Sequence, residues 1–173
     1  MEPNAAGGSK PTKSCDPDGK VKPPALREGS MSVELPFAPV DTIIRRNAGN
    51  LRVSADAAQE LAQRIQDRGA ELAAVAAERA TEHGRKTIMA ADFDVDEVPD
   101  ADRLELPIAP IDRIARLEID DRYRVGQDAR VALASVLETF ADEAATGAAL
   151  LARHAGRRTV QSEDVETYFE LVG

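Results

Sequence analysis

A short phrase occurs twice in this chain and marks two similar halves. Residues 34–41 read ELPFAPVD and residues 105–112 read ELPIAPID. The copies lie 71 residues apart at this phrase and 72 apart further along, so one extra residue lies between Arg116 and Arg124. We expect a loop there, because loops tolerate insertions and packed helices do not. Such an internal duplication predicts two copies of one small structural unit.

The spacing of apolar residues predicts three helices in the first copy. A short helix is expected over 40–48, a long one over 54–82 without any proline, and a final short one over 90–98, closed by Pro99. The long helix would measure roughly 43 Å at 1.5 Å per residue.

The second copy repeats this plan, with a long helix over about 127–155 and a last helix over 162–171. Two short helices cannot cover the apolar stripe of so long a helix. A second long helix crossing the first would cover it, and the duplication supplies that helix within the same chain. We therefore predict an all-α fold in which the two halves pair intramolecularly.

Composition divides the 173 residues into four parts. We predict a disordered N-terminal arm over 1–32, a first folded half over 33–98, an acidic linker over 99–103 and a second folded half over 104–173. Met31 offers an alternative start, in which case the preceding arm is not part of the protein. The single cysteine, Cys15, lies in the arm and is expected to be a solvent-exposed bystander.

The net charge of −9 and the scarcity of lysine limit the setting in which the chain works. Lys86 is the only lysine outside the arm. An acidic surface of this kind is typical of a cytoplasm rich in salt. We find neither a membrane-spanning apolar run nor the blocks of a signal peptide, so a cytoplasmic protein is expected.

No pattern of catalytic residues is present. The sequence has no Ser-His-Asp order at usable spacing, no Gly-rich phosphate loop and no Cys/His cluster. We therefore expect no enzyme activity, no catalytic residues, no cofactor, no metal site and no small-molecule substrate.

The duplicated landmarks resemble the archaeal histone family in its fused-doublet form, of haloarchaeal type. Besides the opening phrase, they are the Arg-Val pairs at 52–53 and 124–125, and the loops GRKT at 84–87 and GRRT at 156–159. The resemblance covers residues 33–172. It implies tandem histone folds, each short helix–long helix–short helix, paired as a handshake pseudo-dimer that binds double-stranded DNA without sequence preference.

The resemblance implies DNA contacts at three kinds of position. Arg52 and Arg124 match the arginine that enters the minor groove, whose negative potential attracts it without base readout. Phosphate contacts from the loops match Lys86, Thr87, Arg158 and Thr159. Basic positions in the first helices match Arg45, Arg113 and Arg116. Thr42 occupies the position in the first half that corresponds to Arg113, so we expect weaker DNA binding on that side.

The resemblance also implies a structural clamp between the second loop and the last helix. Its pairs are Arg85 with Asp92 and Arg157 with Asp164.

Family dimers join through a surface that only the second half keeps. Its residues here are Leu151, His154 and Asp164, whereas the first half has Arg79 and Glu82 in place of the first two. Because this charged pair disfavours a four-helix contact, we expect self-association through the second half only, with two chains per assembly.

The acidity leaves two functions open. Arginines gathered near helix ends and loops favour modest, nonspecific DNA binding with a role in chromatin and transcription at the nucleoid. The acidic balance favours the alternative, a histone-fold protein-interaction scaffold or transcription-factor subunit with little DNA binding.

Overall fold

The computed structural model describes residues 32–173, so the predictions for the arm, Cys15 and Met31 fall outside the described part. The elements follow the order α1 (Phe37–Ala48), β1 (Arg52–Val53), α2 (Ala55–Glu82), β2 (Thr87–Ile88), the 3₁₀ turns η1 (Ala90–Phe93) and η2 (Ala101–Arg103), α3 (Ile108–Ala115), β3 (Arg124–Val125), α4 (Gln127–His154), β4 (Thr159–Val160) and α5 (Ser162–Val172). The all-α fold class predicted from the sequence is confirmed.

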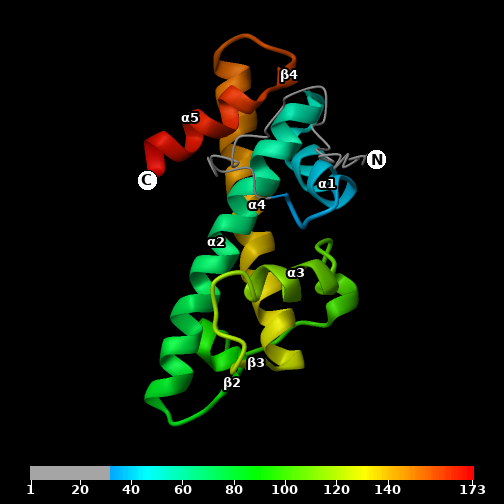
Figure 1. The fold of residues 1–173 in the computed structure, drawn as a ribbon. Coiled ribbons are helices and arrows are strands. Elements are labelled where there is room, and N and C mark those ends of the chain that lie inside the picture. The colour runs from blue at the N-terminus through cyan, green and yellow to red at the C-terminus, as the bar shows by residue number, and fades with distance from the viewer. Residues whose placement is uncertain (1–31) are drawn as a thin grey trace, which may run out of the picture. The chain divides into compact units, whose positions relative to one another are not determined.

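The two long helices, α2 and α4, have 28 residues each and cross one another at the centre of the folded part (Figure 1). Their buried faces consist largely of alanine. At Gly69 a Cβ atom would lie 2.7 Å from Ile114 Cγ2 and 2.9 Å from Leu137 Cδ1. A side chain at this position would therefore clash with the side chains of Ile114 and Leu137.

The short helices pack across the halves. Helix α1 packs against α4 of the second half, α3 packs against α2 of the first half, and α5 contacts both long helices. The largest buried side chains come from both halves and form one core, with Ile43, Leu61, Ile65, Ile111 and Leu137 among them. Burial of apolar surface between the halves is thus what holds the fold together.

Two short parallel ladders join the halves at opposite ends of the crossing (Figure 1). Strand β1 pairs with β4, with Arg52 opposite Thr159. Strand β2 pairs with β3, with Thr87 opposite Arg124. Each ladder therefore combines the first loop of one half with the second loop of the other.

The prediction of a final helix over 90–98 is wrong, because the first half has only the 3₁₀ turn η1 in this region. Asp94 adopts a left-handed conformation, with φ of 61°, and ends the turn. In α5 the helix continues because Phe169 packs against Phe140, with ring centroids 5.4 Å apart. The first half has Glu97 at the position of Phe169, so no apolar side chain holds a helix there.

The other expected elements agree with the structure to within a few residues. Helix α1 begins at Phe37 rather than Val40, and Pro39 fits its first turn because the N–H groups there have no helical partner. The expected loop at the insertion is present, since α3 ends at Ala115 and β3 starts at Arg124. None of the described helices is long and apolar enough to cross a bilayer.

A polar network ties α1 to α4. Arg46 Nη2 lies 2.9 Å from Glu138 Oε1 and 2.6 Å from Asp142 Oδ2, and Asn47 Nδ2 lies 2.6 Å from Asp142 Oδ1. Burial alone would raise the pKa of Asp142, but hydrogen bonds from Arg46 and Asn47 outweigh it and lower the pKa. The other oxygen of Glu138 accepts the backbone N–H of Glu105 at 2.7 Å.

The equivalent contact between α3 and α2 lacks the ion pairs. Gln66 stands at the position of Glu138 and accepts the Glu34 N–H at 2.7 Å, while Leu117 stands at the position of Arg46. The two halves are therefore not interchangeable: two copies of the second half would leave the buried Glu138 without its arginine.

Gly147 offers a test of the packing between α4 and α5. A Cβ atom there would lie 2.2 Å from Tyr168 Cδ2 and 2.4 Å from its Cε2. We expect Gly147→Ala to lower the free energy of unfolding by about 1–3 kcal/mol through overpacking, measured by chemical denaturation. In a Tyr168→Ala background the same change should be neutral or should stabilise by up to about 1 kcal/mol, as alanine favours helix. An equal cost in both backgrounds would contradict this account.

Candidate nucleic-acid interface

The two ladders form two loop junctions. The β1–β4 junction comprises residues 50–53 and 158–160, and the β2–β3 junction comprises residues 84–88 and 122–125. In the first, the Arg52 N–H donates to the Arg158 carbonyl at 2.9 Å. In the second, the Arg124 N–H donates to the Lys86 carbonyl at 2.9 Å. Arg52 and Arg124, the arginines expected to enter the minor groove, thus each lie beside a basic residue of the other half.

Two glycines direct the chain into these junctions. Gly84 and Gly156 follow the long helices with φ of 69° and 72°. Glycine adopts this left-handed conformation readily, whereas it costs other residues energy. A Cβ atom at either position would meet no other atom within 4 Å, so the turn requires glycine for its backbone conformation and not for space. The turn sends residues 85–87 and 157–159 toward the ladders.

Most basic side chains of residues 32–173 are already neutralised. Eleven of them lie within 4.0 Å of a carboxylate oxygen. The remaining basic side chains of this part of the chain have no such partner: Arg52, Lys86, Arg122, Arg124, Arg153 and Arg158. All six lie in or next to the two junctions, and Arg153 is bonded through Nη2 to the Ala48 carbonyl at 2.8 Å.

The arginines predicted on the first helices lie in exposed ion pairs. Arg45 Nε lies 2.5 Å from Asp41. Arg113 Nε lies 3.1 Å from Glu34, and Arg116 Nε lies 3.1 Å from Asp112. Exposed ion pairs contribute only about 0–1 kcal/mol, so a phosphate group can replace such a carboxylate at little cost. Thr42, on the same helix as Arg45, bonds its own helix at the Ala38 carbonyl, 2.9 Å away.

The residues expected to form the clamp lie together in both halves. Arg85 donates two hydrogen bonds to Asp92, of 2.8 and 3.0 Å, and Arg157 pairs with Asp164. Burial alone would raise the pKa of Asp92, but hydrogen bonds from Arg85 and the Met89 N–H outweigh it and lower the pKa. These pairs anchor the loops that carry the junction residues.

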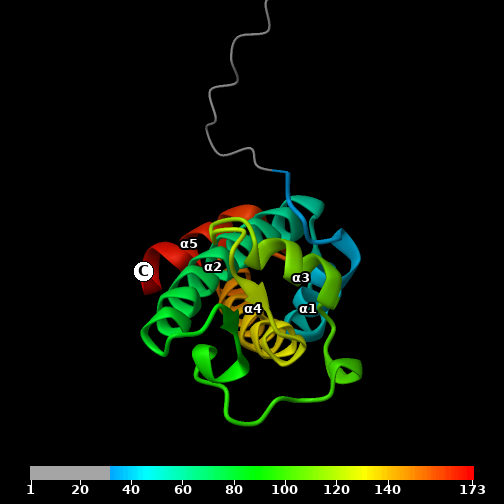
Figure 2. The same ribbon diagram turned by 60° about the horizontal axis from the view of Figure 1, so that its bottom comes forward.

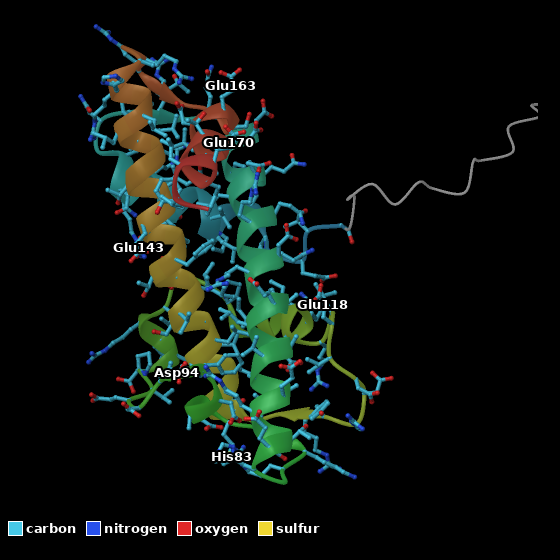
Figure 3. All side chains as sticks on the ribbon, turned by 90° about the vertical axis from the view of Figure 1, so that its left-hand side faces the viewer. His83, Asp94, Glu118, Glu143, Glu163 and Glu170 are labelled. Carbon is cyan, nitrogen blue, oxygen red and sulfur yellow. The ribbon has the colours of Figure 1, made fainter. Side chains whose placement is uncertain are left out.

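The residues expected at the self-association surface lie at the end of α4. Leu151 is half-buried and His154 is exposed, whereas Asp164 is 1% exposed and engaged by Arg157. In the first half, Arg79 contacts Asp94 at 2.7 Å and the Asp92 carbonyl at 2.9 Å. Figure 3 shows Asp94 and His83 toward the C-terminal end of α2.

Sequence reasoning did not single out Arg122 or Tyr123. They line a cavity of about 180 Å³ together with Lys86, at the β2–β3 junction. A signal was present in the inserted loop, which carries an arginine two positions before Arg124, where the first half has Asn50.

Two histone folds built into one chain, with basic loop junctions at both ends, define a histone-like class of protein. The family described as histone-like transcription factor (CBF/NF-Y) and archaeal histone matches residues 33–94 and 104–167. The chain therefore belongs to this family. Proteins with the histone fold are structural DNA-binding proteins and not enzymes, which confirms the prediction that this chain is not an enzyme.

Individual relatives agree with this assignment. The chain is 54% identical over 61 residues to one subunit of the archaeal histone HAN1 from Thermococcus zilligii, covering 35% of this chain and 88% of that protein. The crystal structure of the histone from Methanopyrus kandleri is similar with a TM-score of 0.61 and 27% identity, over 78% of this chain and 92% of that one. A protein from Thermus thermophilus shares the fold, with a TM-score of 0.63 and 18% identity, over 80% of this chain and 97% of that one.

The clamp predicts how stability depends on pH. Because the folded pKa of Asp92 lies below the unfolded value of about 3.9, the unfolded chain takes up the proton first, and stability falls below about pH 4. We expect Asp92→Asn to lower the free energy of unfolding at pH 7 by about 1–3 kcal/mol and to flatten its decline between about pH 4 and 2. Denaturation curves across pH measure both. The exposed Asp121→Asn is the control, and an unchanged pH dependence in Asp92→Asn would contradict the role of this pair.

Proposed function

We propose that the chain binds duplex DNA without sequence preference through its two loop junctions. The observation that carries this proposal is the distribution of basic side chains lacking a carboxylate partner. Within residues 32–173 they occur only in or next to the junctions, although acidic residues neutralise basic ones everywhere else. Cations that are not neutralised within the protein remain available for phosphate.

The arrangement suits the backbone of a duplex. Helices α1 and α3 lie side by side on one side of the long helices, between the two junctions (Figures 1 and 2). In the proposed complex, Arg52 and Arg124 enter the minor groove, where they gain from its negative potential. The loop contacts to phosphate come from Lys86, Thr87, Arg158 and Thr159. Arg45, Arg113 and Arg116 supply further phosphate contacts by exchanging their carboxylates.

The net charge of −9 sets the strength of this binding. If about six phosphates are neutralised, a tenfold rise in salt costs roughly five decades of affinity. Binding of this kind responds steeply to salt and is modest in a salt-rich cell. We therefore propose a chromosome-associated protein that modulates transcription rather than one that coats the chromosome.

A protein-interaction scaffold with little DNA binding is the second candidate. It is favoured by the neutralisation of eleven basic side chains within the protein. In that case the junction cations would make no difference to any interaction with DNA.

The junction arginines provide the test. We expect Arg52→Ala/Arg124→Ala to weaken duplex binding by at least about tenfold, because each arginine loses its place in the groove. Electrophoretic mobility shifts across a salt series measure this. The matched control is Arg68→Ala/Arg103→Ala, which removes the same charge from two exposed ion pairs and should leave affinity within about twofold. Equal binding by the double variant and wild type would refute groove insertion, and no binding by wild type would favour the scaffold.

We further propose that two chains join through the second half, at the end of α4. Leu150 is 64% exposed there and Leu151 is half-buried, which leaves apolar surface to be covered. The first half has Arg79 and Glu82 at the positions of Leu151 and His154, and Arg79 is held by Asp94. These charges disfavour a contact at that end, so assembly stops at two chains.

Exchange of these residues tests the assembly. We expect Leu151→Arg/His154→Glu, which copies the first half, to give single chains by analytical ultracentrifugation, because buried charges would oppose the contact. The reciprocal Arg79→Leu/Glu82→His should give assemblies of more than two chains. Persistence of the wild-type assembly in the first variant would show that the chains join elsewhere.

A further inference from the structure

Arg122 has a fixed orientation although it makes no ion pair with a described carboxylate. Its guanidinium carbon lies 5.0 Å from the centroid of the Tyr123 ring, and its Nη2 lies 3.1 Å from the Tyr123 hydroxyl. A guanidinium carries five N–H donors, so most of them remain unused. The side chain is therefore a cation held in place with donors available.

The tyrosine beneath Arg122 is itself anchored. Tyr123 is 8% exposed, and its hydroxyl lies 2.6 Å from Thr81 Oγ1 at the end of α2. Hydrogen bonds with Thr81 and Arg122 lower the pKa of Tyr123. Tyr123 thus connects the inserted loop of the second half to α2, the long helix of the first half.

The contact with Tyr123 places Arg122 at the β2–β3 junction. Arg122 and Lys86 line the same cavity of about 180 Å³, and the next residue but one in the chain is Arg124. At the β1–β4 junction the corresponding positions hold Asn50 and Leu51. The β2–β3 junction therefore has an arginine at a position where the β1–β4 junction has Asn50.

The carboxylates nearest in sequence do not neutralise Arg122. Asp120 Oδ1 accepts the backbone N–H of Arg122 at 2.9 Å and so serves the turn. Figure 3 shows Glu118 well away from the end of α2 marked by His83. Asp121 is exposed and, like Glu118 and Asp120, forms no ion pair with Arg122. These acids reduce the local potential but leave the guanidinium donors open.

We propose that Arg122 is a further phosphate-binding residue, which takes a backbone phosphate of duplex DNA next to the one bound at Lys86. The inference rests on the proposed function and deepens it. It adds a phosphate contact at the β2–β3 junction, beside Lys86 and Arg124, at a position where the β1–β4 junction has Asn50.

The salt dependence of duplex binding by the full chain tests this inference. Each phosphate contact contributes a slope of about −0.9 to a plot of log affinity against log salt concentration, so Arg122→Gln should lower the magnitude of the slope by about 0.9. Arg103→Gln removes the same charge from an exposed ion pair on η2 and should leave the slope unchanged. Fluorescence anisotropy with a labelled duplex measures all three proteins.

The outcomes separate this inference from the proposal on which it rests. A reduced slope in Arg122→Gln alone supports the contact. A wild-type slope in Arg122→Gln, while Arg52→Ala/Arg124→Ala binds weakly, overturns the inference and leaves the proposed function standing. Equal reductions in Arg122→Gln and Arg103→Gln would reveal an effect of net charge and also overturn it. No duplex binding by wild type overturns both.

Discussion

The mutual burial of two long helices is the constraint on which the rest of this structure depends. Neither α2 nor α4 has enough short helices in its own half to cover its alanine-rich face, so each long helix covers the other. The close approach at Gly69 makes this crossing tight. Because the helices cross, the loops at their ends are brought together between halves, and both junctions are consequences of the same packing.

The contacts between the short helices and the opposite long helices differ in the two halves. The network of Arg46, Glu138 and Asp142 lies only between α1 and α4, while Gln66 and Leu117 take the equivalent places between α3 and α2. Without Arg46 the largely buried Glu138 carboxylate would lose a charged partner, at a cost that the partial exposure of Arg46 reduces. Such a difference favours pairing of the first half with the second. The chain thus consists of two similar but unequal halves.

Positive and negative charges are distributed unevenly over the described part of the chain. Carboxylates neutralise the arginines along the helices, and the basic side chains without a carboxylate partner lie in or next to the junctions in the described residues. A protein with a net charge of −9 can in this way present local positive surface without being basic as a whole. In the proposed complex with DNA, binding through so few contacts would respond steeply to salt.

The sequence by itself determined the tandem all-α fold, the two long helices and the loop landmarks, because helical periodicity and an internal repeat are local signals. It did not determine the end of the first half, where a helix over 90–98 is expected. Asp94 adopts a left-handed conformation there, and Glu97 stands where Phe169 packs against Phe140 in α5. Nor did sequence reasoning show that Arg45, Arg113 and Arg116 lie in ion pairs, or that Arg122 rests on Tyr123 beside Lys86. Arg45 and Arg116 pair with carboxylates four residues away, a spacing that the sequence already contains. The contacts of Arg46 with Asp142 and of Arg113 with Glu34 were decided only by the tertiary structure, because the crossing of the helices brings these segments of the two halves together.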